Sequence, residues 1–237
     1  MSRIFLLSPA TCSRPRAQLL ISPRTQFDLA VRLRLPDGAP LAEVFTFLSG
    51  LYFRGKIAYA QAFAQPPRRL RRINYTSANR TRSHFPANDI SANRTRSTAP
   101  GGVFVITPSR GLQLADHALT AGVLGEFGRI QIDTANDAYR RPLEASARLV
   151  AQLAGKRAEV VLLGSIATGK YVDVLLDVFG DRLLFPSDFV GRGDMSRGGL
   201  MLRCARAGQE LAYVPVRGAV RHGARPRRLE PLRRRAR

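Results

Sequence analysis

The amino-acid sequence predicts a three-layer α/β fold with a mostly parallel central sheet. Short apolar runs alternate along the chain with longer segments of helical pattern, which is the element order of a sheet covered by helices. The runs at 4–7, 103–106 and 160–163 are continuously apolar, as expected for strands buried on both faces. A chain of 237 residues with 45% hydrophobic residues can also build the core that such a sheet needs. We therefore expect these three runs to form the central strands.

The other elements follow in chain order from the same pattern. Helices are expected at 41–64, 141–154, 170–179 and 198–207, and strands at 159–163, 183–185 and 210–216. Gly180 and Gly208 stand where two of the helices should end, and Pro142 suits a first helical turn. In sheets of this kind, ligands bind beyond the carboxyl ends of the strands. The loops that follow the strands are therefore where a functional site is expected.

Two arginine-rich segments carry most of the positive charge. The chain has a formal net charge of +21, of which 66–98 contributes +7 and 217–237 contributes +8. The first segment contains the heptapeptide SANRTRS twice and has too few apolar residues to fold by itself. We expect one domain over 1–216, with a disordered insertion at 66–98 and a disordered tail at 217–237. The two segments are interpreted either as arms that bind nucleic-acid phosphates or as a compositional insertion and a frayed terminus.

The composition also restricts the class of protein. No apolar run approaches the roughly 18 residues that a membrane-spanning helix needs, so no membrane partner is expected. Cys12 and Cys204 are the two cysteines, and they offer neither a disulfide framework nor a set of metal ligands. We expect a soluble, cytoplasmic protein that uses no metal or other cofactor.

The strongest local motif follows the third central strand. Its spacing, G-x-x-x-x-G-K, resembles the phosphate loop of nucleotide hydrolases, in which backbone N–H groups and a lysine hold phosphates. Tyr171 departs from that motif, because it stands where serine or threonine would bind magnesium. The interpretations are a metal-free phosphate or ribose site, a nucleotide hydrolase, and a simple Gly-Ser turn before a helix. The candidate ligand-binding residues here are Gly164, Ser165, Thr168, Gly169 and Lys170.

Two more loops after expected strands, 8–13 and 107–112, are rich in hydroxyl groups. Their small residues would allow a ligand to approach the backbone closely. For 107–112 the alternative is an ordinary turn with a proline at its corner. The candidate ligand-binding residues of these loops are Ser8, Ser109, Arg110 and Gly111.

A glycine-rich segment precedes the last expected helix. Ser196 is expected to cap this helix, and Gly198 and Gly199 would leave its first N–H groups open to an anion, so both glycines are candidate ligand-binding residues. Asp188 and Asp194 lie on either side of the start of this segment. They are the candidate catalytic carboxylates.

Tyr52, Lys56 and Tyr59 share one face of the long expected helix, because they are spaced by four and three residues. A lysine between two tyrosines would grip a phosphate or stack on a base. The alternative is an amphipathic helix with its tyrosines at the edge of the core and its lysine extending into solvent. Tyr52 and Lys56 are the candidate ligand-binding residues.

Short motifs in the first half of the chain occur in a recognisable order. A strand ends in Ser-Pro, a helix carries a Leu-Tyr and a Tyr-Ala pair, and a second strand leads into a turn that ends in Gly-Leu. This order resembles a family of small bacterial α/β domains of unknown function that look like distant relatives of the peroxide-stress protein YaaA. The family's first-loop lysine is absent here. The matching residues are Tyr52, Tyr59, Gly111 and Leu112, with Thr107 where serine is usual. The resemblance implies nucleotide or nucleic-acid chemistry.

We expect a protein that binds a nucleotide or a nucleic-acid base through its strand-end loops. If it is an enzyme, a metal-independent transfer or hydrolysis at a glycosidic or phosphoryl centre fits best, with Asp188 or Asp194 as acid or base. Lys170 and Arg110 would stabilise the charge that develops. The alternative is a non-catalytic nucleic-acid-binding protein that works through the arginine-rich segments. The sequence leaves the oligomeric state open.

Overall fold

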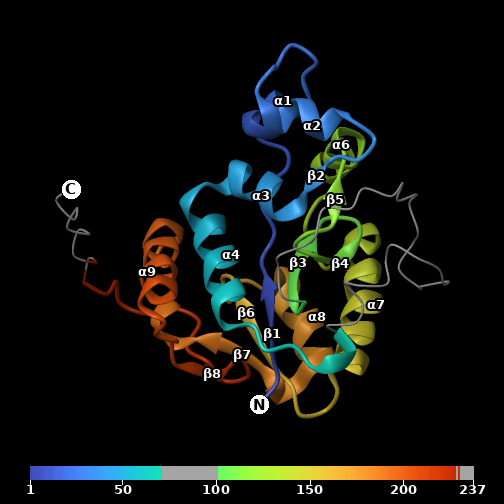
Figure 1. Cartoon of the computed structure of the whole chain (residues 1–237). Helices are drawn as coiled ribbons and strands as arrows, with labels where there is room; N and C mark the ends of the chain where they lie inside the picture. The colour runs from blue at the N-terminus through green and yellow to red at the C-terminus, as the bar shows by residue number, and fades with distance from the viewer. Residues whose placement is uncertain (71–100, 228, 230–237) are drawn as a thin grey trace.

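The computed structural model of the chain describes residues 1–70, 101–227 and 229. Its six main strands are β1 (Arg3–Leu7), β3 (Val103–Thr107), β4 (Gly111–Leu114), β6 (Glu159–Leu163), β7 (Leu183–Pro186) and β8 (Tyr213–Pro215). They form one sheet in the order β4-β3-β1-β6-β7-β8 (Figure 1). The four inner strands run parallel, and each edge strand runs antiparallel to its neighbour. The predicted α/β class with a mostly parallel sheet is confirmed.

Helices cover both faces of this sheet. On one face α4 (Leu51–Phe63) packs against α9 (Asp194–Ala207), and on the other α7 (Asp137–Ala154) packs against α8 (Gly169–Phe179) (Figure 1). None of the helices in the described part of the chain is both long enough and apolar enough to cross a membrane.

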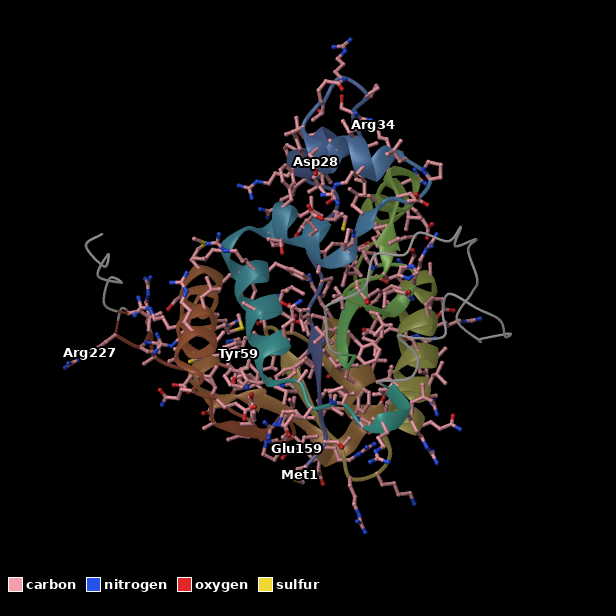
Figure 2. The ribbon with its side chains drawn as sticks, in the orientation of Figure 1. Met1, Asp28, Arg34, Tyr59, Glu159 and Arg227 are labelled. Atoms are coloured by element: carbon pink, nitrogen blue, oxygen red, sulfur yellow. The ribbon has the colours of Figure 1, made fainter. Side chains whose placement is uncertain are left out.

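The remaining elements form a cap beyond the carboxyl ends of β1 and β3. They are α1 (Pro15–Ile21), α2 (Asp28–Arg34), α3 (Leu41–Ser49), α6 (Ala121–Arg129) and the antiparallel pair β2 (Ala39–Pro40) and β5 (Ala118–Leu119). In Figure 2, Asp28 and Arg34 mark the cap, whereas Met1 and Glu159 mark the opposite edge of the sheet. The sequence pattern predicted none of these elements except the region of α3.

The three continuously apolar runs are central strands, as predicted. β1 lies between β3 and β6, so Phe5 pairs with Val103 on one side and with Val161 on the other. Every apolar side chain of these runs is buried, because helices lie on both faces.

Two predicted helices have different limits in the structure. The helix expected at 41–64 is divided by Gly50, whose φ of 59° is a conformation that other residues rarely adopt. The helix expected at 141–154 starts earlier, because the side chain of Asn136 accepts a hydrogen bond from a backbone N–H of its first turn. Pro142 therefore lies inside α7 and not in its first turn.

Two predicted loops are also shorter than expected. The segment 107–112 is a tight hairpin, in which Thr107 Oγ1 donates a 2.8 Å hydrogen bond to the Gly111 carbonyl. The last helix, α9, begins at Asp194, so Ser196 lies inside the helix and does not cap it. Most of the glycine-rich segment is therefore helical backbone.

The first residues of the predicted insertion and of the predicted tail pack on the domain. Pro66 and Leu70 are buried, and Leu70 belongs to the hydrophobic core. In the predicted tail, the Ala224 backbone lies so close to Gly191 that a side chain at this glycine would strike it. The rest of both segments, at 71–100, 228 and 230–237, lies outside the described residues.

Leu70→Ala tests where the domain gives way to the insertion. Because Leu70 is 2% exposed, we expect this truncation to lower the free energy of unfolding by about 2–4 kcal/mol. Arg69→Ala, at the exposed neighbouring position, is the control and should change it by less than about 0.5 kcal/mol. Urea denaturation of the three proteins provides the measurement. Equal stability of wild type and Leu70→Ala would show that the domain ends before residue 70.

Candidate functional site

The carboxyl ends of β1 and β6 form the topological switch point of the sheet. From β1 the chain continues to β3 on one side, and from β6 it continues to β7 on the other. Ligands of open α/β sheets bind outside the strand ends at such a point. Ser8 follows β1 and Gly164 follows β6, and a Cβ atom at Gly164 would lie 2.7 Å from Ser8 Cβ. The structure thus brings two predicted site residues from distant parts of the chain together.

A buried lysine reaches this point from α4. Lys56 is 1% exposed, and its Nζ donates hydrogen bonds to Ser8 Oγ at 2.6 Å and to the Ser8 carbonyl at 3.2 Å. The same nitrogen lies 3.9 Å from the centre of the Tyr52 ring, where a cation–π interaction is favourable. Three residues that the sequence predicted in two separate segments are therefore in contact.

The close crossing of α4 and α9 holds Lys56 in this position. Gly55 of α4 faces Gly198 of α9, and a Cβ atom at Gly55 would lie 2.5 Å from the Gly198 carbonyl oxygen. The absence of both side chains lets the two backbones approach until they touch. Gly198 was predicted to leave helix N–H groups open to an anion. In the structure, the backbone of Leu51 and Tyr52 in α4 packs directly against it. We assign it to helix packing.

Burial controls the charge of Lys56. It lowers the pKa of Lys56 to about 7, while the nearby Asp194 carboxylate opposes this shift and the Arg197 guanidinium adds to it. Asp194 is exposed at the start of α9 and lies 3.8 Å from Arg197. Of the two predicted catalytic carboxylates, Asp194 is thus the one whose charge affects the pKa of Lys56.

Tyr52 and Tyr171 lie against the Ser8–Lys56 pair, and Tyr139 lies near Tyr171. The Tyr171 hydroxyl donates a 2.7 Å hydrogen bond to the Ser165 carbonyl and lies 2.9 Å from where a Cβ atom of Gly164 would be. The hydroxyl groups of Tyr52 and Tyr139 are buried and make no hydrogen bond with the described residues. Burial raises the pKa of Tyr52, and the nearby Arg197 guanidinium opposes that shift. Two buried hydroxyls are thus left for a ligand or for water.

Tyr171, Tyr139 and Arg197 were not among the residues predicted from the sequence. Tyr171 was noted only as the residue that breaks the phosphate-loop motif, although its position three residues into the α8 segment turns it back toward the strand ends. The N-terminal turn of α7, which carries Tyr139, was expected to be outside the helix. No local pattern distinguishes Arg197 from the many other arginines of the chain.

The first turn of α8 holds the exposed part of the predicted phosphate loop. Thr168 is the N-cap residue but makes no side-chain hydrogen bond to the helix, and both Thr168 and Lys170 are exposed. A Cβ atom at Gly169 would meet the Asp173 side chain and not the protein backbone. This turn therefore offers an exposed hydroxyl and an exposed ammonium group.

The predicted site residues after β3 form a separate cluster. Ser109 and Arg110 both donate hydrogen bonds to Glu126 of α6. Although burial acts in the opposite direction, these bonds lower the pKa of Glu126. Gly111 packs against the Pro142 carbonyl with a φ of 62°, so a side chain there would be strained and would clash. The three predicted ligand-binding residues thus tie the hairpin to the helices, which is a structural role.

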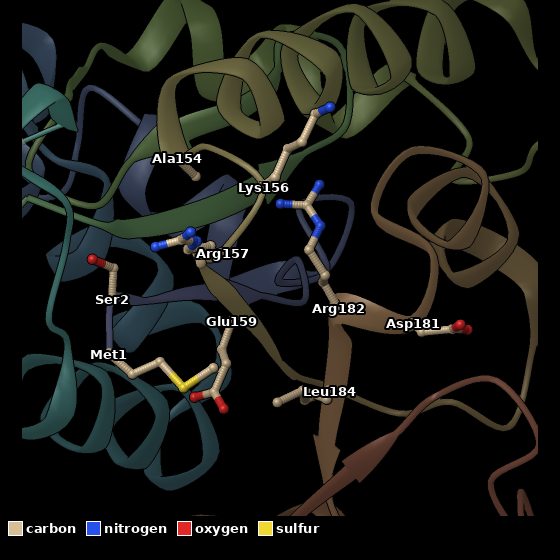
Figure 3. A pocket seen from close by; sticks show the side chains of 10 residues that line it. Met1, Ser2, Ala154, Lys156, Arg157, Glu159, Asp181, Arg182 and Leu184 are labelled. Carbon is tan, nitrogen blue, oxygen red and sulfur yellow. The ribbon is translucent and has the colours of Figure 1, made fainter.

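The other predicted residues also lie apart from Lys56. Asp188 is exposed in the 3₁₀ helix Ser187–Phe189. Burial raises the pKa of the Cys204 thiol, and the Asp188 charge adds to that shift. Gly199 lies on α9, where Leu229 is its nearest neighbour. The hollow in Figure 3 is at the amino-terminal edge of the sheet, where Met1, Glu159 and Arg182 line it, away from the switch point.

The chain was compared with family models, curated proteins and solved structures, and nothing in the three comparisons matches it. The resemblance to YaaA-like domains therefore stays a prediction.

Lys56→Met tests the buried ammonium group. The unfolded chain has the ordinary lysine pKa of 10.5 and the folded chain a pKa of about 7, so the unfolded state binds more protons between these values. The burial penalty is therefore complete below pH 7 and is relieved as the pH rises toward 10.5. At pH 6.5 we expect the variant to be more stable than wild type by about 1–3 kcal/mol. Urea denaturation should show this gap narrowing by pH 10, and a gap independent of pH would contradict the assignment.

Gly55→Ala tests the helix crossing. The added methyl group would meet the Gly198 backbone, which cannot rotate away, so we expect a loss of about 1–3 kcal/mol in the free energy of unfolding. Gly122→Ala in α6 is the matched control, because the nearest atom to its new Cβ would be 4.0 Å away. It should leave stability unchanged or raise it by up to about 1 kcal/mol. If Gly55→Ala is as stable as wild type, the contact does not hold the two helices together.

Proposed function

We propose that this protein binds a nucleotide, or a nucleic-acid base with its phosphate, at the switch point of the sheet. The observation that carries the proposal is the convergence of Ser8, Lys56 and Gly164 on the carboxyl ends of β1 and β6. We use the name switch-point site for these three residues together with Tyr52, Ser165, Thr168, Lys170, Tyr171, Asp194 and Arg197.

The proposed phosphate position is the first turn of α8. The Lys170 ammonium and the Thr168 hydroxyl are both exposed there, and the helix dipole adds partial positive charge. Arg197 supplies a second cation from α9, with 11% of its side chain exposed and with its guanidinium held by the Phe189 carbonyl. Two cations from different helices suit a dianionic phosphate better than a neutral ligand.

The proposed position of the base or sugar is closer to the strand ends. The unpartnered hydroxyl of Tyr52 offers a hydrogen bond to a ligand, and burying it without one costs free energy. Gly164 has no side chain, so its backbone lies close to Ser8 and to the Tyr171 hydroxyl. A nucleotide has the polar edges and the flat face that such a mixture of tyrosine and backbone groups binds.

The arginine-rich arms are the second proposed source of nucleic-acid affinity. Much of both arms lies outside the described residues, so no observation favours them over the switch-point site. Affinity that arises from the arms should fall steeply with salt, since it depends on release of counterions from phosphates.

Lys170→Ala is expected to weaken phosphate or nucleotide binding by about 1.5–3 kcal/mol, the value of a hydrogen bond to a charged group. The fold should be unaffected, because the side chain is exposed. Lys156→Ala, an exposed lysine at the opposite edge of the sheet, is the matched control. The measurement is calorimetric titration of the three proteins with inorganic phosphate and a panel of mononucleotides. If Lys170→Ala binds every ligand as tightly as wild type, the first turn of α8 does not hold the phosphate.

A further inference from the structure

We propose that Ser8 is a nucleophile toward a phosphoryl centre and that Lys56 is its general base. This inference rests on the proposed function, since it names the chemistry that the switch-point site would perform on a phosphate ester or anhydride. The known means of activating a serine is an adjacent base within hydrogen-bond distance, and lysine is one of the residues that serve as that base.

The geometry of the pair fits this role. Lys56 Nζ lies 2.6 Å from Ser8 Oγ, within the range expected for proton transfer between a nucleophile and its base. The lysine side chain is enclosed, whereas Ser8 keeps 7% of its surface exposed. Of the two residues, Ser8 is therefore the more exposed.

The surroundings of Lys56 favour the form that a base requires. An ammonium group can only donate hydrogen bonds, so the lysine must lose a proton before it can accept the one from Ser8. Burial promotes this loss, Arg197 of α9 adds to the effect, and Asp194 of α9 opposes it. The other titratable groups that face the pair are Tyr52 on α4 and Tyr171 on α8, and burial raises the pKa of both.

Gly164 packs directly against Ser8, and both residues are buried. A Cβ atom at this residue would lie 3.1 Å from Ser8 Oγ, so any larger residue would cover the nucleophile. The Tyr52 ring lies 3.9 Å from Lys56 Nζ, and the Arg197 charge acts on the same nitrogen. The Tyr52 hydroxyl and the Arg197 guanidinium are suited to stabilise negative charge on a phosphoryl oxygen.

The proposed reaction balances with water as the only co-reactant. Ser8 Oγ attacks phosphorus and forms an O–P bond while its proton passes to Lys56 Nζ. The bond from phosphorus to the leaving oxygen breaks, and Lys56 returns the proton to that oxygen. A water molecule then attacks the phosphoserine, gives a proton to Lys56 and releases phosphate, after which the proton returns to Ser8.

A structural role alone does not explain a lysine at position 56, because burying its charge costs free energy. A methionine or leucine would fill the same volume without a buried charge, and such replacements of buried ionic groups are often neutral or stabilising. Perturbed titratable groups beside a ligand position are more typical of functional sites. Lys56 is such a group, because burial lowers its pKa and it contacts Ser8 at the switch point.

The experiment uses a fluorophosphonate, in which the attacked atom is phosphorus and fluoride is the leaving group. The full chain is treated with the probe, and the adduct is located by mass spectrometry in the tryptic peptide 4–16, where fragmentation separates Ser8 from Ser13. We expect the adduct on Ser8. Ser8→Ala should abolish it, and Lys56→Met should slow it by about 100-fold, the lower range of general-base catalysis. Ser13→Ala and Lys156→Met are the matched controls and should react as wild type.

The pH dependence separates a base from a residue that only holds Ser8 in place. The rate of labelling should rise with pH through about 7 and then level off, because neutral Lys56 is the active form. This rise should be absent from Lys56→Met, whose folding is checked by its melting curve. An adduct on another residue, no adduct, or an unchanged rate in Lys56→Met would overturn the proposal.

Two further outcomes separate this inference from the proposed function. If mononucleotides bind in calorimetry but Ser8 is not labelled, the binding function stands and the nucleophile is rejected. If Ser8 is labelled and reacts with p-nitrophenyl acetate but not with an aryl phosphate ester, the phosphoryl assignment is rejected. Protection of Ser8 from the probe by a mononucleotide would support both proposals.

Discussion

The contact between the backbones of α4 and α9 is the constraint on which the candidate site depends. Gly55 and Gly198 carry no side chains where the helices cross, so α4 lies as close to α9 as two helices can. Lys56 follows Gly55 directly and is therefore held between the end of β1 and the first turns of α9. A wider crossing would bring water closer to the ammonium group and would weaken the burial that lowers the pKa of Lys56.

Lys56 links the stability of the domain to its chemistry. Its burial costs free energy at neutral pH, because the folded state must either enclose a charge or release a proton. The same burial makes the neutral amine available next to the Ser8 hydroxyl. Lys56 makes the domain less stable than an apolar residue at this position would. Such a loss is expected where function and stability compete.

Polar groups at the amino-terminal and carboxyl ends of the strands differ in how fully they are hydrogen-bonded. At the amino-terminal edge, Arg3 forms ion pairs with Glu159 and Glu210, and Tyr59 shares a 2.6 Å hydrogen bond with Tyr213, so that network is closed. At the carboxyl edge, the buried hydroxyls of Tyr52 and Tyr139 have no hydrogen-bond partner among the described residues. A closed network holds elements together, whereas open groups are suited to a partner that comes and goes.

The sequence by itself determined the layers of this protein. Continuous apolar runs identify buried strands because helices must cover both of their faces, and the order of elements then places the functional loops at the carboxyl ends. Ser8 and Gly164 were accordingly among the residues predicted, and Lys56 was predicted from its spacing between two tyrosines on one helix face. The tertiary structure decided which of these residues meet. It separated Ser109 and Arg110, which pair with Glu126, from the switch-point site, and it added Tyr171 and Arg197. Local patterns report the burial of a residue along its own element, but contacts between residues such as Ser8 and Lys56, 48 positions apart, depend on how helices cross and strands pair.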